Sequence, residues 1–61
     1  DALVFNTHFD KEIKFKVYNL VGQEIKSFNT NGQQPIDISE ISTGIYILKS
    51  ESGQFIKFQK K

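Results

Sequence analysis

A strict alternation of apolar and polar side chains over residues 12–18 constrains the fold of this chain more than any other feature. Ile13, Phe15 and Val17 fall on one side of an extended backbone, and the intervening lysines fall on the other. This two-residue period is typical of an antiparallel strand with one buried face. No window repeats apolar residues at helical spacing for long, and β-branched and aromatic residues dominate. The sequence therefore predicts an all-β fold.

Turn-forming residues divide the chain into short strands at intervals of roughly 8 to 12 residues. An Asn-Gly pair at Asn31–Gly32 predicts a tight reversal. Pro35 predicts an edge position for its strand, because proline cannot donate to the ladder of hydrogen bonds. Ile41 is expected to fill the core from the connection that follows. This pattern favours a small sandwich or a partial barrel. The expected strands span residues 2–6, 12–18, 23–28, 34–38, 44–50 and 54–60.

The length of 61 residues limits the chain to one domain with a small core. It has no cysteine and a single histidine, His8, so disulfides and His-rich or Cys-rich zinc sites are excluded. Stability must then come from apolar packing or from neighbours outside the chain. We expect it to be marginal, and we expect loss of the last five residues to unfold the domain.

The charge is balanced: eight lysines and seven carboxylates give a net charge of +1, and there is no arginine. This composition argues against binding to nucleic acid or to an anionic membrane surface. The longest apolar runs have four residues, 2–5 and 45–48, so no transmembrane helix is expected. The chain begins at Asp1 without a signal peptide, and we expect it to be a fragment of a longer protein whose export signal lies upstream.

The segment 44–48 is apolar on both faces of the expected strand. One interpretation is a central strand whose outer face is partly shielded by lysine stems. The other is a docking surface for a partner. The aromatic residues are also open to two interpretations, since they could stack on bases. Core packing is the better account, because the chain lacks arginine and is nearly neutral.

Candidate catalytic groups are few. His8 stands alone in a polar loop, so neither a Ser-His-Asp nor a Cys-His arrangement can form. Asp37 and Glu40 flank Ser39 and could form an acid–base pair, although carboxylates near turns more often bind backbone amides. The four glycines are widely spaced and form no phosphate-binding loop. The chain is therefore predicted to be no enzyme and to hold no cofactor or metal.

Two segments together resemble the C-terminal sorting domain of the type IX (Por) secretion system: Lys16-Val17-Tyr18-Asn19-Leu20-Val21-Gly22-Gln23-Glu24-Ile25 and residues 36–49, which contain Gly44-Ile45-Tyr46. The lysine-ending tail, residues 55–61, and the opening, residues 1–5, are also similar to the family. The Asn-Pro segment that normally precedes the first strand is missing. Either a short upstream piece of the domain is absent, or the chain starts at a processing site.

The resemblance implies a small Ig-like antiparallel β-sandwich of about six to seven short strands at the C-terminus of a larger secreted protein. It implies a non-catalytic signal that directs its cargo across the outer membrane of a Gram-negative bacterium. The implied partners are the outer-membrane translocon, shuttle proteins and a surface sorting peptidase. The implied location is the periplasm in transit, then the cell surface or the medium. A weak homodimer through exposed strand edges is a further expectation.

Recognition is expected at the start of the strand 44–50 and in the lysine tail. Gly44 and Tyr46 could equally serve the backbone and the core, and the tail lysines could serve only solubility. The alternative function is a structural or carbohydrate-binding Ig-like accessory module, which could lie inside its protein rather than at the end. The recognition candidates are Gly44, Tyr46, Lys57, Lys60 and Lys61.

Overall fold

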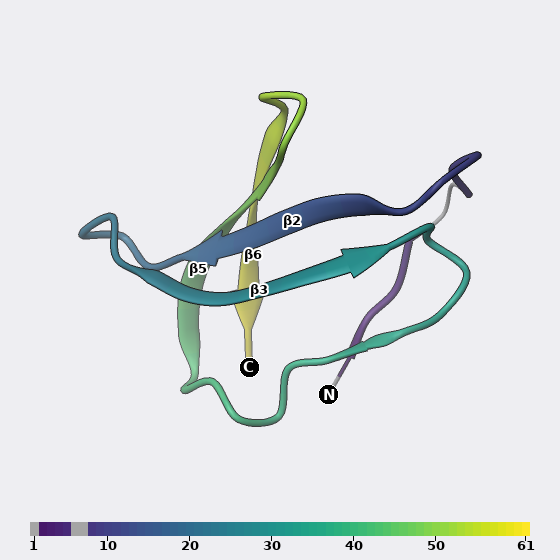
Figure 1. Cartoon of the computed structure of the whole chain (residues 1–61). Coiled ribbons are helices and arrows are strands. Elements are labelled where there is room, and N and C mark those ends of the chain that lie inside the picture. Colours follow the sequence, from purple (N-terminus) through teal and green to yellow (C-terminus); the bar gives the residue numbers. More distant parts are fainter. Residues whose placement is uncertain (1, 6–7) are drawn as a thin grey trace.

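The computed structural model describes residues 2–5 and 8–61, and over these residues it contains six strands in two antiparallel sheets and no helix (Figure 1). The predicted all-β class and the small sandwich-like, Ig-like architecture are thereby confirmed. The strands are β1 (Ala2–Leu3), β2 (Ile13–Tyr18), β3 (Glu24–Thr30), β4 (Ile36–Asp37), β5 (Gly44–Ser50) and β6 (Phe55–Lys60).

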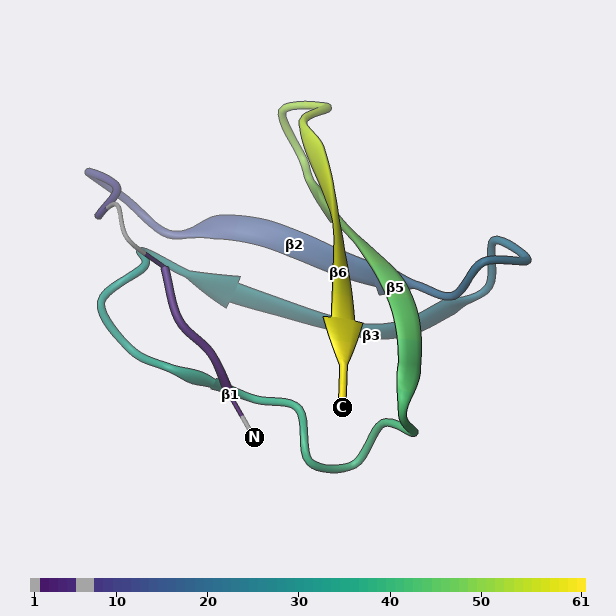
Figure 2. The same cartoon turned by 180° about the vertical axis from the view of Figure 1, so that it is seen from behind.

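The larger sheet has the strand order β3-β2-β5-β6, with every neighbouring pair antiparallel. Its inner face follows from the register, because directly paired residues point to the same side. Phe15 lies opposite Phe28, and Val17 lies opposite Leu48. Both views show β2 and β3 crossing the β5–β6 hairpin at a large angle, which is the result of the strong twist of this narrow sheet (Figures 1 and 2).

The smaller sheet joins the beginning of the chain to its middle. Strands β1 and β4 pair through only two registers, Ala2 with Asp37 and Leu3 with Ile36. Both strands are shorter than the expected ranges 2–6 and 34–38. Strand β1 ends at Leu3, before the largely exposed Val4, and Asn6 lies outside the described residues. Strand β4 begins directly after Pro35, which agrees with the edge position expected for this segment.

The core lies between the inner face of the large sheet and the segment around β4. Ile38 and the predicted core residue Ile41 are both buried against Val17, which is completely buried. The partly buried Leu3, Phe5 and Phe9 close the side near β1. The buried cluster consists of Phe15, Val17, Ile38, Ile41, Tyr46 and Leu48.

An aromatic cluster forms around Phe15. The centroid of its ring lies 5.2 Å from that of Phe5, 6.1 Å from that of Phe9 and 5.6 Å from that of Phe28. These rings come from β2, β3 and the chain between β1 and β2, so a single side chain ties three parts of the sequence together. In a domain without disulfides, such packing is the main source of stability.

Candidate recognition site

The start of β5 is fixed to the preceding loop by Tyr46. Its ring is buried and stacks on Phe58, with centroids 5.8 Å apart. Its hydroxyl donates a hydrogen bond of 2.6 Å to the backbone carbonyl of Ser42. This bond resembles the tyrosine corner of sandwich domains, in which a tyrosine hydroxyl binds the backbone a few residues upstream. Tyr46 therefore holds the 38–44 connection against the sheet.

Gly44 and Lys60 belong to the same arrangement. They lie directly opposite each other in the β5–β6 ladder. The Lys60 ammonium donates a 2.7 Å hydrogen bond to the carbonyl of Ile41. Gly44 has a φ of +156°, and a Cβ atom at this position would contact the Tyr46 ring at 3.8 Å. Gly44 and Lys60 therefore both help to hold the loop before β5 in place. Their role in recognition stays a prediction.

Replacing Tyr46 with phenylalanine should lower the free energy of unfolding by about 1 kcal/mol, because the change removes the bond to Ser42 and leaves that carbonyl without its partner. Urea denaturation followed by circular dichroism measures the difference. Tyr18→Phe is the matched control, since Tyr18 lies on the outer face, where the described residues offer its hydroxyl no hydrogen bond. Equal losses in both variants would contradict the proposed role of the Tyr46 hydroxyl.

The remaining tail candidates, Lys57 and Lys61, are exposed. Lys57 lies within β6 and Lys61 directly follows it. Strand β6 is an edge of the large sheet, because among the described residues no strand pairs with its outer side. Two large apolar side chains, Phe55 (73% exposed) and Ile56 (62% exposed), lie at the start of this strand. The edge therefore combines lysines, apolar side chains and unpaired backbone groups, which are the features that protein partners use.

The β2–β3 turn presents a second exposed apolar feature that the sequence patterns did not single out. Leu20 (65% exposed) and Val21 (80% exposed) form its tip. The Asn19 carboxamide oxygen accepts hydrogen bonds from the backbone N–H groups of Val21 and Gln23, at 3.1 and 3.0 Å. Gly22 adopts the positive φ of +89° that the turn requires. The tip is thus held in one shape by its flanking asparagine.

Strand β5 has the central position proposed for it, between β2 and β6. Tyr46 and Leu48 face the core, while Ile45 and Ile47 point outward. Ile47 is half-buried opposite Lys57, whereas Ile45 remains 42% exposed opposite Gln59. Neighbouring polar side chains therefore cover the outer face of this strand only in part.

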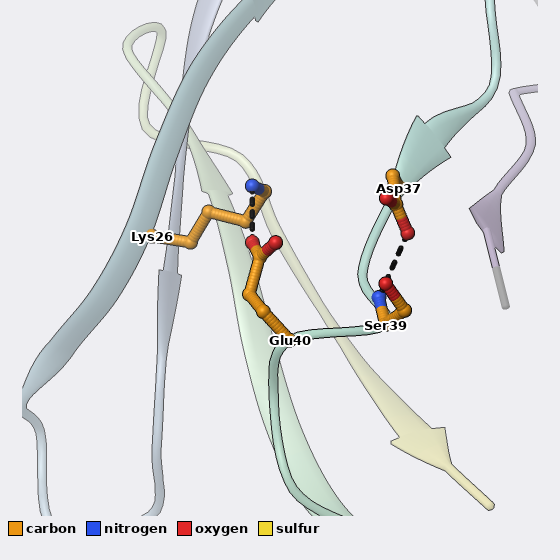
Figure 3. A network of polar contacts seen from close by, with 4 residues as sticks. All are labelled: Lys26, Asp37, Ser39 and Glu40. Carbon is orange, nitrogen blue, oxygen red and sulfur yellow. Dashed lines mark hydrogen bonds and ion pairs between the residues drawn. The ribbon is translucent and has the colours of Figure 1, made fainter.

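The two candidate carboxylates have separate partners (Figure 3). Glu40 forms an ion pair with Lys26. Asp37 accepts a 2.9 Å hydrogen bond from the backbone N–H of Ser39, and this bond and one from the Ser39 hydroxyl hold the pKa of Asp37 below its ordinary value. A lowered pKa suits a structural acceptor better than a general acid. Between them, these contacts fix the turn after β4.

The lowered pKa of Asp37 predicts a pH-dependent contribution to stability. The carboxylate is favoured in the folded domain, so its contribution is complete above the ordinary pKa of about 4 and is lost as the pH falls through the lower folded pKa. Asp37→Asn should lower the melting temperature at neutral pH, and the difference should shrink in acid. Thermal melts at several pH values, with Asp10→Asn as the control at another exposed aspartate, measure this effect. A difference that persists unchanged below pH 4 would contradict it.

No group of three or more His, Asp or Glu residues that could hold a metal ion occurs within residues 2–5 and 8–61. His8 is exposed. In the part of the chain that the structure describes, no helix is long and apolar enough to span a membrane.

Comparison with known protein families gives a match to the secretion system C-terminal sorting domain over residues 2–61. The chain belongs to this family. The type IX sorting domain is a non-catalytic signal that directs cargo for secretion through the type IX machinery to the cell surface or beyond. Neither the curated proteins nor the solved structures include a significant match.

The residues on which the resemblance rests have defined places in the sorting domain. The first segment, residues 16–25, covers the end of β2, the exposed turn and the start of β3. The second, residues 36–49, covers β4, the connection held by Tyr46 and most of β5. The first segment of the sorting domain thus forms an exposed turn, and the second contributes mainly to the core.

Proposed function

We propose that this sorting domain is carried at the C-terminus of a larger secreted protein and is bound as a folded surface by the outer-membrane translocon and its shuttle proteins. The family match over residues 2–61 is the observation that carries the proposal. In this proposal the domain has no catalytic activity of its own. The cargo crosses the periplasm, passes the outer membrane and meets a surface sorting peptidase that removes the domain.

We assign the direct contact to the exposed side of β6 and the tail, with Lys57 and Lys61 as the charged anchors. Their exposure supports this assignment, because both side chains are available to a partner without unfolding. Gly44, Tyr46 and Lys60 contribute to recognition indirectly in this proposal, since their contacts hold the β5–β6 hairpin in shape. A signal that is read as a surface needs no reactive group.

The free edge of β6 also supports a weak homodimer. Ser50 donates a 2.8 Å backbone hydrogen bond to Gln54, which makes this a hydrogen-bonded pair. Pairs alternate along an antiparallel ladder, so Phe55, Lys57 and Gln59 direct their backbone groups to the unpaired side. A second copy could add its own β6 there. Light scattering at increasing protein concentration tests this association.

The proposal is tested by fusing residues 1–61, with their native upstream sequence, to a periplasmically exported fluorescent protein. The fusion is expressed in a host with an intact type IX system and in one that lacks the translocon. We expect fluorescence in the surface or medium fraction of the intact host alone. Fluorescence trapped in the periplasm of both hosts, with a folded domain, would overturn the proposal and favour an accessory module.

The same assay tests the assigned residues. Lys57→Gln and Lys61→Gln, alone and together, remove the tail charges without removing buried area. The combined variant should export less reporter than the parent fusion. Lys11→Gln is the matched control, because it removes one exposed lysine from a loop before β2.

A further inference from the structure

Half of the lysines lie on the outer face of the large sheet. Within β2, Lys14 and Lys16 alternate with core residues. Lys49 of β5 lies opposite Lys16, and Lys57 of β6 lies opposite Ile47. These four residues account for four of the eight lysines, whereas the whole chain has a net charge of only +1. Counted with Glu24 and Glu51, which lie among these lysines, the outer face has four positive and two negative charges, and it is more positive than the molecule as a whole. We call these four residues the lysine face.

One contact in the lysine face is unfavourable for the fold. Lys16 and Lys49 occupy directly opposed positions on neighbouring strands, where like charges destabilise a sheet. The Lys16 ammonium lies 3.4 Å from a carboxylate oxygen of Glu24, which offsets part of this repulsion. Within the described residues, no carboxylate lies within 4 Å of the Lys49 ammonium. The folded domain would be at least as stable without this pair of charges.

A shallow hollow lies at the same place. It has a volume of about 310 Å³ and an apolar wall formed by Tyr18. Tyr18 lies opposite Ile47, which extends the apolar surface toward β6. The face therefore offers positive charges around an apolar strip. The hollow is lined by Lys14, Lys16, Tyr18, Lys49, Ser50 and Glu51.

We propose that the lysine face docks onto an acidic protein surface of the type IX machinery. This inference rests on the proposed function and extends the contact surface from the tail, with which it shares Lys57, to β5 and β2. Charge complementarity identifies the partner: opposed lysines that repel each other in the free domain would both be neutralised by carboxylates of the partner. The apolar strip of Tyr18 and Ile47 would pack against uncharged side chains of the same surface.

A protein fits this face better than a lipid or a nucleic acid. Two carboxylates lie among the lysines, Glu24 beside Lys16 and Glu51 in the lining of the hollow. A dense array of phosphates would be repelled by both, whereas a protein can place its own cations opposite them. The chain also contains no arginine, the residue best suited to bidentate phosphate contacts.

The test compares Lys16→Gln/Lys49→Gln with the parent fusion in the intact type IX host. Secretion should fall by on the order of tenfold, because electrostatic attraction that speeds the encounter is lost. The melting temperature of the purified variant should stay equal or rise. Loss of secretion without loss of stability excludes unfolding as the cause. Ser27→Ala/Asn29→Ala, two neutral changes on β3 of the same face, should leave secretion unchanged.

A second measurement uses the purified domain and does not depend on secretion. Poly-L-glutamate should shift the amide resonances of Lys16 and Lys49, the shift should weaken with added salt, and the double variant should not respond. If the parent fusion is secreted and the double variant is secreted equally well, the inference is wrong while the proposed function stands. If the parent fusion is not secreted, the proposed function fails. If the purified domain binds phosphatidylglycerol vesicles but not poly-L-glutamate, the inference of an acidic protein partner is wrong.

Discussion

Replacing Phe15 with alanine should lower the free energy of unfolding by about 3 to 5 kcal/mol, the usual cost of removing a buried aromatic side chain. Phe15 is buried and contacts three other rings, so few neighbours can move to fill the space. A domain of this length has a total stability of roughly 3 to 9 kcal/mol. The loss is comparable to this total, so the unfolded fraction of the variant should rise sharply near room temperature, which circular dichroism and urea titration will show.

The matched control for Phe15 is Phe55, which is also a phenylalanine within a strand of the large sheet. Its side chain is 73% exposed, so Phe55→Ala should change stability by less than about 0.5 kcal/mol. Similar losses in the two variants would show that stability does not depend on the aromatic cluster. A folded Phe15→Ala domain with an unchanged melting temperature would contradict the packing described for the core.

Removing residues 57–61 should abolish the cooperative thermal transition. The truncation deletes four of the six β5–β6 pairs, from Lys57–Ile47 to Lys60–Gly44. It also removes the Phe58 ring that stacks on Tyr46 and the Lys60 bond to Ile41. The loop before β5 then loses its hydrogen bond from Lys60, and Tyr46 loses the ring that covers it.

Deletion of Lys61 alone is the control for this truncation, because Lys61 lies beyond the end of β6. That variant should keep the melting temperature of the parent domain. Near-ultraviolet circular dichroism, which reports the packing of the tyrosines, distinguishes loss of fold from loss of one strand. A five-residue truncation that retains both its near-ultraviolet signal and its melting temperature would overturn the role given to β6.

Much of the fold could be predicted because the strands of the large sheet have one buried face. The alternation over residues 12–18 predicts β2, and the expected strand 44–50 coincides with β5. The strand order and the register of the sheet are harder to predict. Strand β2 pairs with β5, far along the chain, and short patterns carry no information about such partners. The strands β1 and β4 are shorter than predicted because they pair only with each other, at Ala2–Asp37 and Leu3–Ile36, and local sequence does not show where such a pairing stops.

The candidate site was predictable in part. Resemblance to the family indicated Gly44, Tyr46 and the tail, but it could not separate side chains that hold the fold from those that face solvent. Burial now separates them: Tyr46 is in the core and Lys57 is on the surface. The lysine face could not be found from local sequence, because Lys16 and Lys49 meet only through the register of two distant strands.

The two-residue pairing of β1 with β4 has a mechanical consequence. A load applied at the N-terminal end reaches first a ladder of two registers, Ala2–Asp37 and Leu3–Ile36. The larger sheet has longer ladders on every strand, so it resists a higher force and should open after the two-register ladder. The domain should therefore unfold under tension in two steps, in which the two-stranded sheet separates first while the four-stranded sheet stays intact.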